Sequence, residues 1–462
     1  MLKTFGNIFK IPDLKKKVFF TLFIIIVHRF GCHVPIPFVD ADAMSNFWTQ
    51  RFGAQGLVNI IDMFSGRAFR NMTVFALGVM PYITASIIIQ LLMVVWPYLE
   101  KIAKEGEIGH KKINQYTRYG TVAIAAFQSM GIALFMLRMN LTTLVEHKLI
   151  FIFITMIAMT AGTTLVMWLG EKITENGIGN GISIIIAIGI MASYPMDINM
   201  TLGMVHQGQL RPLWVLVVLA LFIILTVFII MIHDGARKIP IQHAKKIVGR
   251  RTMSGSTTYL PLKVNQAGVI PVIFSSAILS FPGLILSMIG FGGGGFFSGL
   301  SNWFQIDSDH NLYSLLGLQL TGVFLLLRSV NIYLVLYTIL TIFFCYFYTA
   351  ITFNPVDTAE NLKKYGAFIP GRRPGKPTSD YIDFVLIRIT LLGAIFLTGV
   401  AVLPMILNVS YRVPYVLTDL IGGVGLIIVV DVFLDTMKQV ESHLLMRHYD
   451  GFSIKKSTRG RW

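Results

Sequence analysis

Residues 73–95 read TVFALGVMPYITASIIIQLLMVV and contain no charged side chain. A helix rises ~1.5 Å per residue, so about 20 apolar residues are enough to cross the ~30 Å hydrocarbon core of a membrane. Nine further apolar runs occur along the 462 residues. We predict that the ten runs are membrane-spanning helices at residues 18–36, 73–95, 118–138, 149–169, 182–196, 213–232, 268–290, 329–351, 384–405 and 414–436. The pattern indicates an all-α polytopic membrane protein.

The distribution of basic residues predicts the orientation of these helices. Of the 39 Lys and Arg residues, 29 lie in the termini and in the connections on one side, eight lie on the other side, and Arg29 and Arg388 fall inside spans. Connections rich in Lys and Arg stay in the cytoplasm. We therefore expect both the N-terminus (1–17) and the tail (437–462) to be cytoplasmic. Most of the +16 net charge is this topological bias, so it does not by itself indicate nucleic-acid binding.

Motifs for covalent or metal chemistry are absent from the sequence. Cys32 and Cys345 lie in separate spans, the ten histidines are scattered, and neither GxxxxGK[ST] nor GxSxG occurs. Gly177-Ile-Gly179-Asn-Gly181 lies between two spans without a preceding strand, and we interpret it as a helix start with Asn180 near the cap. We expect no catalytic residue, no metal site and no cofactor, and hence no enzyme.

Two long connections on the cytoplasmic side, residues 233–263 and 352–383, are strongly basic. In the second, Asn354-Pro355 predicts a helix start, Gly366 a helix stop and Gly371-Arg-Arg-Pro-Gly375 a rigid turn. Paired guanidiniums bind phosphate and carboxylate equally well. We predict that the two Arg-rich tips dock a partner, with ribosomal RNA and an acidic protein surface both suitable; the tips are Arg250, Arg251, Arg372 and Arg373.

Isoleucines recur in spans that also carry Gly or Pro. Ile83 and Ile87, like Ile182 and Ile186, are four residues apart and share a helix face. Residues 53–72, before the second run, are too short and too polar to span, which favours a re-entrant or interfacial segment on the outer side.

Five separated segments resemble the SecY family of bacterial protein-conducting channels. They are FALGVMPYITASIIIQLL (75–92), GEIGHKKINQYTRYGT (106–121), ITENGIGNGISIII (173–186), LPLKVNQAGVIPVIF (260–274) and FNPVDTAENLKKYGAFIPGRRPG (353–375). The resemblance implies two pseudo-symmetric, inverted five-helix halves around a central pore in the bacterial plasma (inner) membrane. The N-terminal half would be residues 18–196 and the C-terminal half residues 197–436.

The resemblance also implies roles for individual residues. The pore ring would be Ile83, Ile87, Ile182, Ile186, Ile273 and Ile428. A plug segment at about 57–71 would close the outer funnel, with Ile60, Ile61, Met63, Phe64, Ser65 and Gly66. A lateral gate, formed by the second and seventh spans with the third and eighth, would include Ser86, Ile88, Gln90, Ser275, Ser276 and Phe281. The partners implied are the small membrane subunits SecE and SecG, the SecA motor ATPase, the ribosome, signal sequences, nascent membrane proteins and lipid.

Two other function classes, a secondary transporter and an integral-membrane enzyme, fit this sequence less well. A secondary transporter shares the two halves and the Gly-broken helices, but it needs ion or proton ligands at mid-membrane, which are scarce here. An integral-membrane enzyme lacks a nucleophile or a metal cluster. Asp431 lies where a charge costs ~2.5–3.5 kcal/mol on insertion scales, so we expect it either to face the cytoplasmic funnel or to be a paired structural carboxylate.

Overall fold

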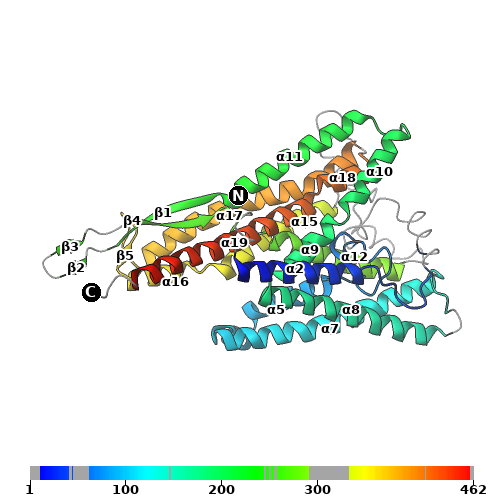
Figure 1. The fold of residues 1–462 in the computed structure, drawn as a ribbon, viewed down its shortest axis with the longest axis horizontal. Helices are drawn as coiled ribbons and strands as arrows, with labels where there is room; N and C mark the ends of the chain where they lie inside the picture. Colours follow the sequence, from blue (N-terminus) through cyan, green and yellow to red (C-terminus); the bar gives the residue numbers. More distant parts are fainter. Residues whose placement is uncertain are drawn as a thin grey trace.

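The computed structural model describes residues 11–40, 44, 62–144, 147–243, 246–248, 251–253, 257–290, 332–411 and 413–457. Long helices run side by side through most of the molecule, and a small sheet extends from one end of them (Figure 1). Helices α10 and α18 lie at the opposite end from this sheet.

Within the described residues, the first part of the chain contains helices joined by turns and two isolated β-bridges. Its helices are α2 (Pro12–Gly31), α5 (Met80–Val95), α6 (Pro97–Lys104), α7 (Glu107–Arg138), α8 (Lys148–Asn176), α9 (Gly181–Met191) and α10 (Tyr194–His206). Asn180 caps α9 as expected, because its side chain accepts a hydrogen bond from the Ser183 N–H at 3.2 Å.

The second part combines helices and short strands. The helices are α11 (Pro212–Asp234), α12 (Ile270–Gly290), α15 (Ile332–Thr352), α16 (Pro355–Lys364), α17 (Lys376–Tyr411), α18 (Tyr415–Ile421) and α19 (Gly423–Ser457). The start predicted for α16 is confirmed: the Asn354 side chain accepts hydrogen bonds from the N–H groups of Val356 and Asp357. Gly366 follows its end with a positive φ of 63°.

Each of the ten predicted spans overlaps a described helix. Among the described residues, seven helical segments are long and apolar enough to cross a membrane, or up to eight if the bent pair α5–α6 forms one span. Helix α2 is not among these candidates, and α12 is represented only by the shorter apolar stretch Ile270–Ser280. The helical membrane class is therefore confirmed, whereas the count of ten crossings stays a prediction.

Two breaks in the helices have local causes. A bend of 100° separates α5 from α6 at Trp96, whose extended backbone (φ −105°, ψ 108°) is the conformation favoured before a proline such as Pro97. Helices α18 and α19 are separated by Gly422, which adopts the left-handed conformation at φ 82°.

The connection 233–263, for which no strand was predicted, contains a hairpin. Strand β1 (Ala236–His243) pairs antiparallel with β4 (Thr257–Lys263), and β5 (Ala367–Phe368) joins the other side of β1. Strands β2 (Lys246–Val248) and β3 (Arg251–Met253) form a separate pair. Ile239, Ile241 and Leu262 are buried at alternate positions along β1 and β4, which is the period-2 pattern of a half-buried strand. Pairing through β5 joins the two basic connections into one sheet.

Candidate functional site

The six isoleucines of the predicted pore ring all belong to, or pack against, one large hydrophobic cluster. Ile83 and Ile87 come from α5, Ile182 and Ile186 from α9, Ile273 from α12 and Ile428 from α19. Five of them are at most 5% exposed, and Ile182 is partly buried against the same cluster. Four helices that are distant in sequence therefore contribute branched apolar side chains to the same cluster.

The described part of the plug segment packs directly against this cluster. Phe64 belongs to the cluster and Met63 contacts it, whereas Ile60 and Ile61 lie outside the described residues. Residues 62–65 form one helical turn. The Ser65 hydroxyl donates to the Asp62 carbonyl and accepts from the Phe69 N–H, both at 3.1 Å, so it organises the turn internally.

Close backbone contacts position this turn. A Cβ on Gly66 would lie 2.9 Å from the Gly189 Cα of α9, a separation that real Cβ atoms essentially never show. A Cβ on Gly425 of α19 would lie 3.3 Å from the Met63 sulfur. The Arg29 guanidinium of α2 donates to the Gly66 carbonyl at 3.1 Å. The plug segment therefore touches α2, α9 and α19.

Charged groups surround the same turn. Burial raises the pKa of the Asp62 carboxyl to about 6, although this carboxyl accepts the Arg70 main-chain N–H at 2.8 Å. The Arg67 guanidinium pairs with the Asp197 carboxylate of α10, and both side chains are largely buried. No pattern in the sequence indicates that Arg67 and Asp197, 130 residues apart, form a pair.

The predicted lateral-gate residues lie on two helices that pack together, α5 and α12. On α5, Ile88 is 44% exposed, and the Gln90 amide donates to the Ser86 hydroxyl at 3.1 Å. On α12, Ser275 and Ser276 are buried and donate to carbonyls of their own helix at 2.8 Å. The side chain of Phe281 lies outside the described part of α12. Helix α5 also packs against α7, and α12 against α15.

The structure describes all of the second Arg-rich tip but only part of the first. Arg372 and Arg373 are exposed in the turn between β5 and α17, where Gly371 and Gly375 both have positive φ. Arg372 lies over the Tyr381 ring, with 5.1 Å from Cζ to the ring centroid, which is a cation–π arrangement. Arg251 starts β3, whereas Arg250 falls outside the described residues.

Asp431 is a paired, buried carboxylate and does not face an open funnel. It is 2% exposed, and its Oδ1 lies 2.6 Å from Nδ1 of His233, a buried histidine at the C-terminal end of α11. The expectation that Asp431 faces the cytoplasmic funnel is therefore wrong, and the alternative of a structural pair holds. A single acidic residue in an apolar run was the signal for such a pair, but no pattern in the sequence identified His233 as its partner.

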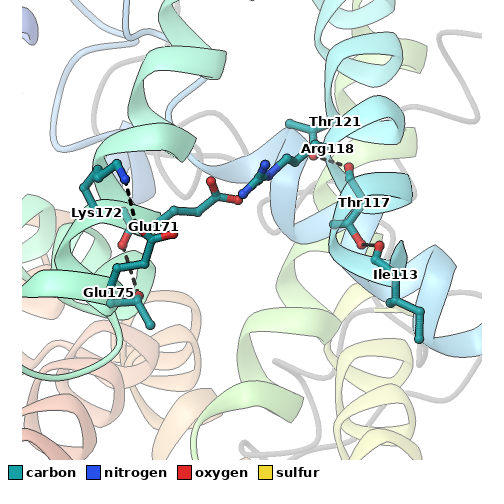
Figure 2. A network of polar contacts seen from close by, with 9 residues as sticks. Ile113, Thr117, Arg118, Thr121, Glu171, Lys172 and Glu175 are labelled. Carbon is teal, nitrogen blue, oxygen red and sulfur yellow. Dashed lines mark hydrogen bonds and ion pairs between the residues drawn. The ribbon is translucent and has the colours of Figure 1, made fainter. Parts of the chain in front are cut away.

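A second polar contact joins the N-terminal part of α7 to the C-terminal part of α8. Figure 2 shows Arg118 of α7 reaching across to Glu171 of α8, with 2.8 Å between Arg118 Nε and Glu171 Oε1. Also on α8, Lys172 pairs with Glu175 at 2.7 Å. Within the described part of the chain, no group of three or more His, Cys, Asp or Glu residues is placed to hold a metal ion.

Comparisons with known proteins show the family to which the chain belongs. The SecY family model matches residues 73–437. The chain is 44% identical to the protein translocase subunit SecY of Streptomyces galbus, over 98% of this chain and 100% of that one. It is 43% identical to the same subunit of Escherichia coli, over 97% of this chain and 96% of that one.

Solved structures show the same fold at lower identity. One described as the structure of a protein conducting channel has a TM-score of 0.62 and 17% identity, covering 93% of this chain and 92% of that one. Another concerns the plug domain of the SecY protein; it has a TM-score of 0.59 and 18% identity over the same shares. Because the family model covers most of the chain and its curated relatives match it over nearly their full length, this chain belongs to the SecY family of protein translocase subunits.

Proposed function

We propose that this chain forms the pore through which unfolded preproteins cross the plasma membrane. The observation that carries the proposal is that Ile83, Ile87, Ile186, Ile273 and Ile428, from four helices, belong to one hydrophobic cluster, which also includes Phe64 and is contacted by Met63. A constriction of stiff, branched apolar side chains dewets when it is empty, so it blocks ions. It also offers a passing polypeptide no hydrogen bonds, so a chain of any sequence can slide through.

The plug segment at about 57–71 closes the outer side of this constriction in the resting channel. Its contacts with α2, α9 and α19 support this role, because they seat it against the helices that carry Ile186 and Ile428. The family's architecture of ten spans in two inverted halves, 18–196 and 197–436, supplies the frame in which the pore lies at the interface of the halves.

A lateral gate between the halves releases transmembrane segments into lipid. The packing of α5 against α12, with α7 and α15 as their further neighbours, supports a seam at this position. Signal sequences and nascent membrane helices partition through the seam by their own hydrophobicity. Ser86, Ser275 and Ser276 have small side chains whose hydroxyls form hydrogen bonds within their own helix. They therefore form few hydrogen bonds across the seam, and separating the two helices costs little free energy.

Energy and partners come from outside the chain. The basic sheet and the turn carrying Arg372 and Arg373 present guanidiniums to the cytoplasm, where an acidic motor surface or ribosomal RNA can dock. We assign SecA and the ribosome as the alternative drivers, and SecE and SecG as small membrane subunits around the channel. Both termini lie in the cytoplasm in this proposal.

Reconstitution tests the proposal. The chain is purified from its native membrane in mild detergent, the co-purifying chains are identified, and the complex is placed in vesicles with SecA, ATP and a preprotein that bears a signal sequence. We expect the preprotein to become resistant to external protease, and the same preprotein without its signal sequence to stay digestible. Ion-driven uptake of a small solute without any preprotein movement would instead identify a secondary transporter.

A further inference from the structure

An apolar groove runs between α7 and α8, the two helices that lie side by side at the lower edge of the molecule in Figure 1. Its volume is about 650 Å³, which is in the range of small-molecule sites. The lining includes Ile157, Ala161, Leu165 and Trp168 of α8 and Ala126 of α7. Ile157, Leu165 and Trp168 are all exposed. Because both helices are candidate membrane spans, the groove opens towards lipid.

The groove has the length of one membrane leaflet. Ile157 and Trp168 are separated along α8 by about 17 Å at 1.5 Å per residue, close to half of a ~30 Å hydrocarbon core. Tryptophan is enriched where hydrocarbon meets the headgroups, so Trp168 marks the interfacial end. The lining hydroxyls are bonded within the protein: Thr160 lies 3.4 Å from the Ser129 hydroxyl, and Thr164 donates to the Thr160 carbonyl at 2.8 Å. The groove therefore suits an acyl chain, whereas a partner helix would cross both leaflets.

Charged residues of both signs lie directly beyond Trp168. Lys172 and Glu175 lie four and seven residues after Trp168, so both project from the side of α8 that carries the groove. They pair with each other at 2.7 Å, and Arg118 of α7 reaches Glu171 at 2.8 Å (Figure 2). Partly exposed ion pairs of this kind contribute little stability. A ligand can therefore replace them at small cost.

The charges at this end of the helix pair are balanced. The described ion pairs each join one base to one acid: Arg118–Glu171, Lys172–Glu175, Lys111–Glu107 and Lys112–Glu105. Sites for anionic lipids instead gather an excess of Lys and Arg. The balance therefore favours a headgroup that carries one negative and one positive charge.

We propose that the groove binds one phospholipid of the phosphatidylethanolamine class, whose headgroup carries a phosphate and a primary ammonium. An acyl chain lies along the groove up to Trp168. The phosphate accepts hydrogen bonds from Lys172 and from Arg118, whose guanidinium has N–H groups besides the Nε that is already bonded. The ammonium donates to the carboxylate of Glu175. This site depends only on α7 and α8 crossing a membrane and is independent of the proposed translocation.

The test measures which lipid the purified complex retains. The intact complex in mild detergent is mixed with equal amounts of phosphatidylethanolamine, phosphatidylglycerol and phosphatidylcholine with identical acyl chains, and native mass spectrometry counts the bound lipid. We expect one phosphatidylethanolamine to be retained at least about fivefold over either competitor, because only its headgroup can donate from an ammonium. Phosphatidylglycerol has no ammonium, and the methylated ammonium of phosphatidylcholine has no N–H.

Matched variants locate the site. Lys172→Gln and Glu175→Gln should each lower this retention at least about fivefold, because each removes a charge-assisted hydrogen bond to the headgroup. Lys111→Gln, at an exposed and paired lysine outside the groove lining, should not. Ala161→Trp fills the groove and should abolish retention of the lipid. Ala220→Trp, at an exposed alanine of α11, is the matched control and should retain the lipid at the parental level.

Three results would overturn the lipid site. The first is equal retention of the three lipids by the parental complex, and the second is parental retention in the Ala161→Trp variant. The third is loss of a small membrane subunit from that variant while the lipid stays bound, which would show that the groove is a protein interface. None of these results bears on the proposed function, because lipid retention is measured without translocation.

Discussion

His233 Nδ1 and Asp431 Oδ1 lie 2.6 Å apart in a buried hydrogen bond that joins the sixth and tenth predicted spans, α11 and α19. One turn further along α19, Asp435 Oδ1 lies 3.5 Å from the other ring nitrogen of His233. Lys438 and Asp234 then pair at 2.8 Å on the adjacent, more exposed surface. A row of polar contacts therefore fixes the register of these two helices.

Breaking the central pair should destabilise the protein measurably. Asp431→Ala leaves the His233 ring buried without its acceptor, and we expect a loss of about 2 to 4 kcal/mol. Asp431→Asn keeps an acceptor and should cost less. Replacing both residues by leucine should be nearly neutral, because no polar group is then left unpaired. Thermal unfolding in detergent measures these differences, and Asp435→Ala, at a 61% exposed side chain, is the control.

The isoleucine ring should be the permeability barrier of the resting channel. Replacing Ile83, Ile87 and Ile186 by glycine or asparagine widens or wets the constriction and removes the dewetting barrier. We expect small ions to pass, with conductance in planar bilayers well above that of the parental protein. The same three changes at lipid-exposed Ile223, Ile224 and Val227 of α11 serve as the control. Parental conductance in the ring variant would show that the seal lies elsewhere.

The bias of basic residues predicts a measurable topology. A reporter that is active only in the cytoplasm should work when it is fused after Lys376 or Lys456. It should fail after Gly208, in the turn between α10 and α11, and after Asp309. Activity at all four positions, or failure at Lys376, contradicts the ten-span arrangement.

Charge reversal at the exposed turn should uncouple the channel from its driver. Arg373→Glu places a carboxylate where an acidic or phosphate surface is expected to dock, so affinity for SecA or for ribosomes should fall by at least about tenfold. Insertion and thermal stability should stay unchanged, because the side chain is exposed. Lys363→Glu, an exposed position of α16 in the same connection, is the matched control. Normal affinity of the Arg373 variant for both partners would show that this turn is not part of the docking surface.

Joining the two gate helices should trap the channel shut. Cysteines at Ile88 and Phe281 form a bridge without strain only if their Cα atoms lie within ~7 Å. Oxidation should then stop signal-dependent translocation, and reduction should restore it. A control pair at Ser129 and Thr160, whose hydroxyls are 3.4 Å apart, joins α7 to α8 and should leave translocation unchanged. Efficient crosslinking at Ile88 and Phe281 with undiminished translocation rules out sideways opening.

Local features were predictable from sequence because their causes are local. Asn180 and Asn354 cap helices since the capping side chain and the N–H groups it accepts lie within three residues of each other. The break at Trp96 has an equally local cause, because the steric clash that keeps a residue out of the helical conformation comes from the following Pro97 alone. The sequence Trp96-Pro97 would therefore have been enough to predict this break. The strands of 236–263 were missed because their short alternation lies within a connection rich in charge.

The sequence by itself determined that this is a polytopic helical membrane protein, because apolar length and the placement of Lys and Arg act through the bilayer, segment by segment. Only the tertiary structure decided that Asp431 is paired with His233, that Arg67 is paired with Asp197, and that β5 joins β1. Each of these contacts joins residues more than a hundred positions apart. Their energies depend on burial and geometry that exist only once the helices have packed.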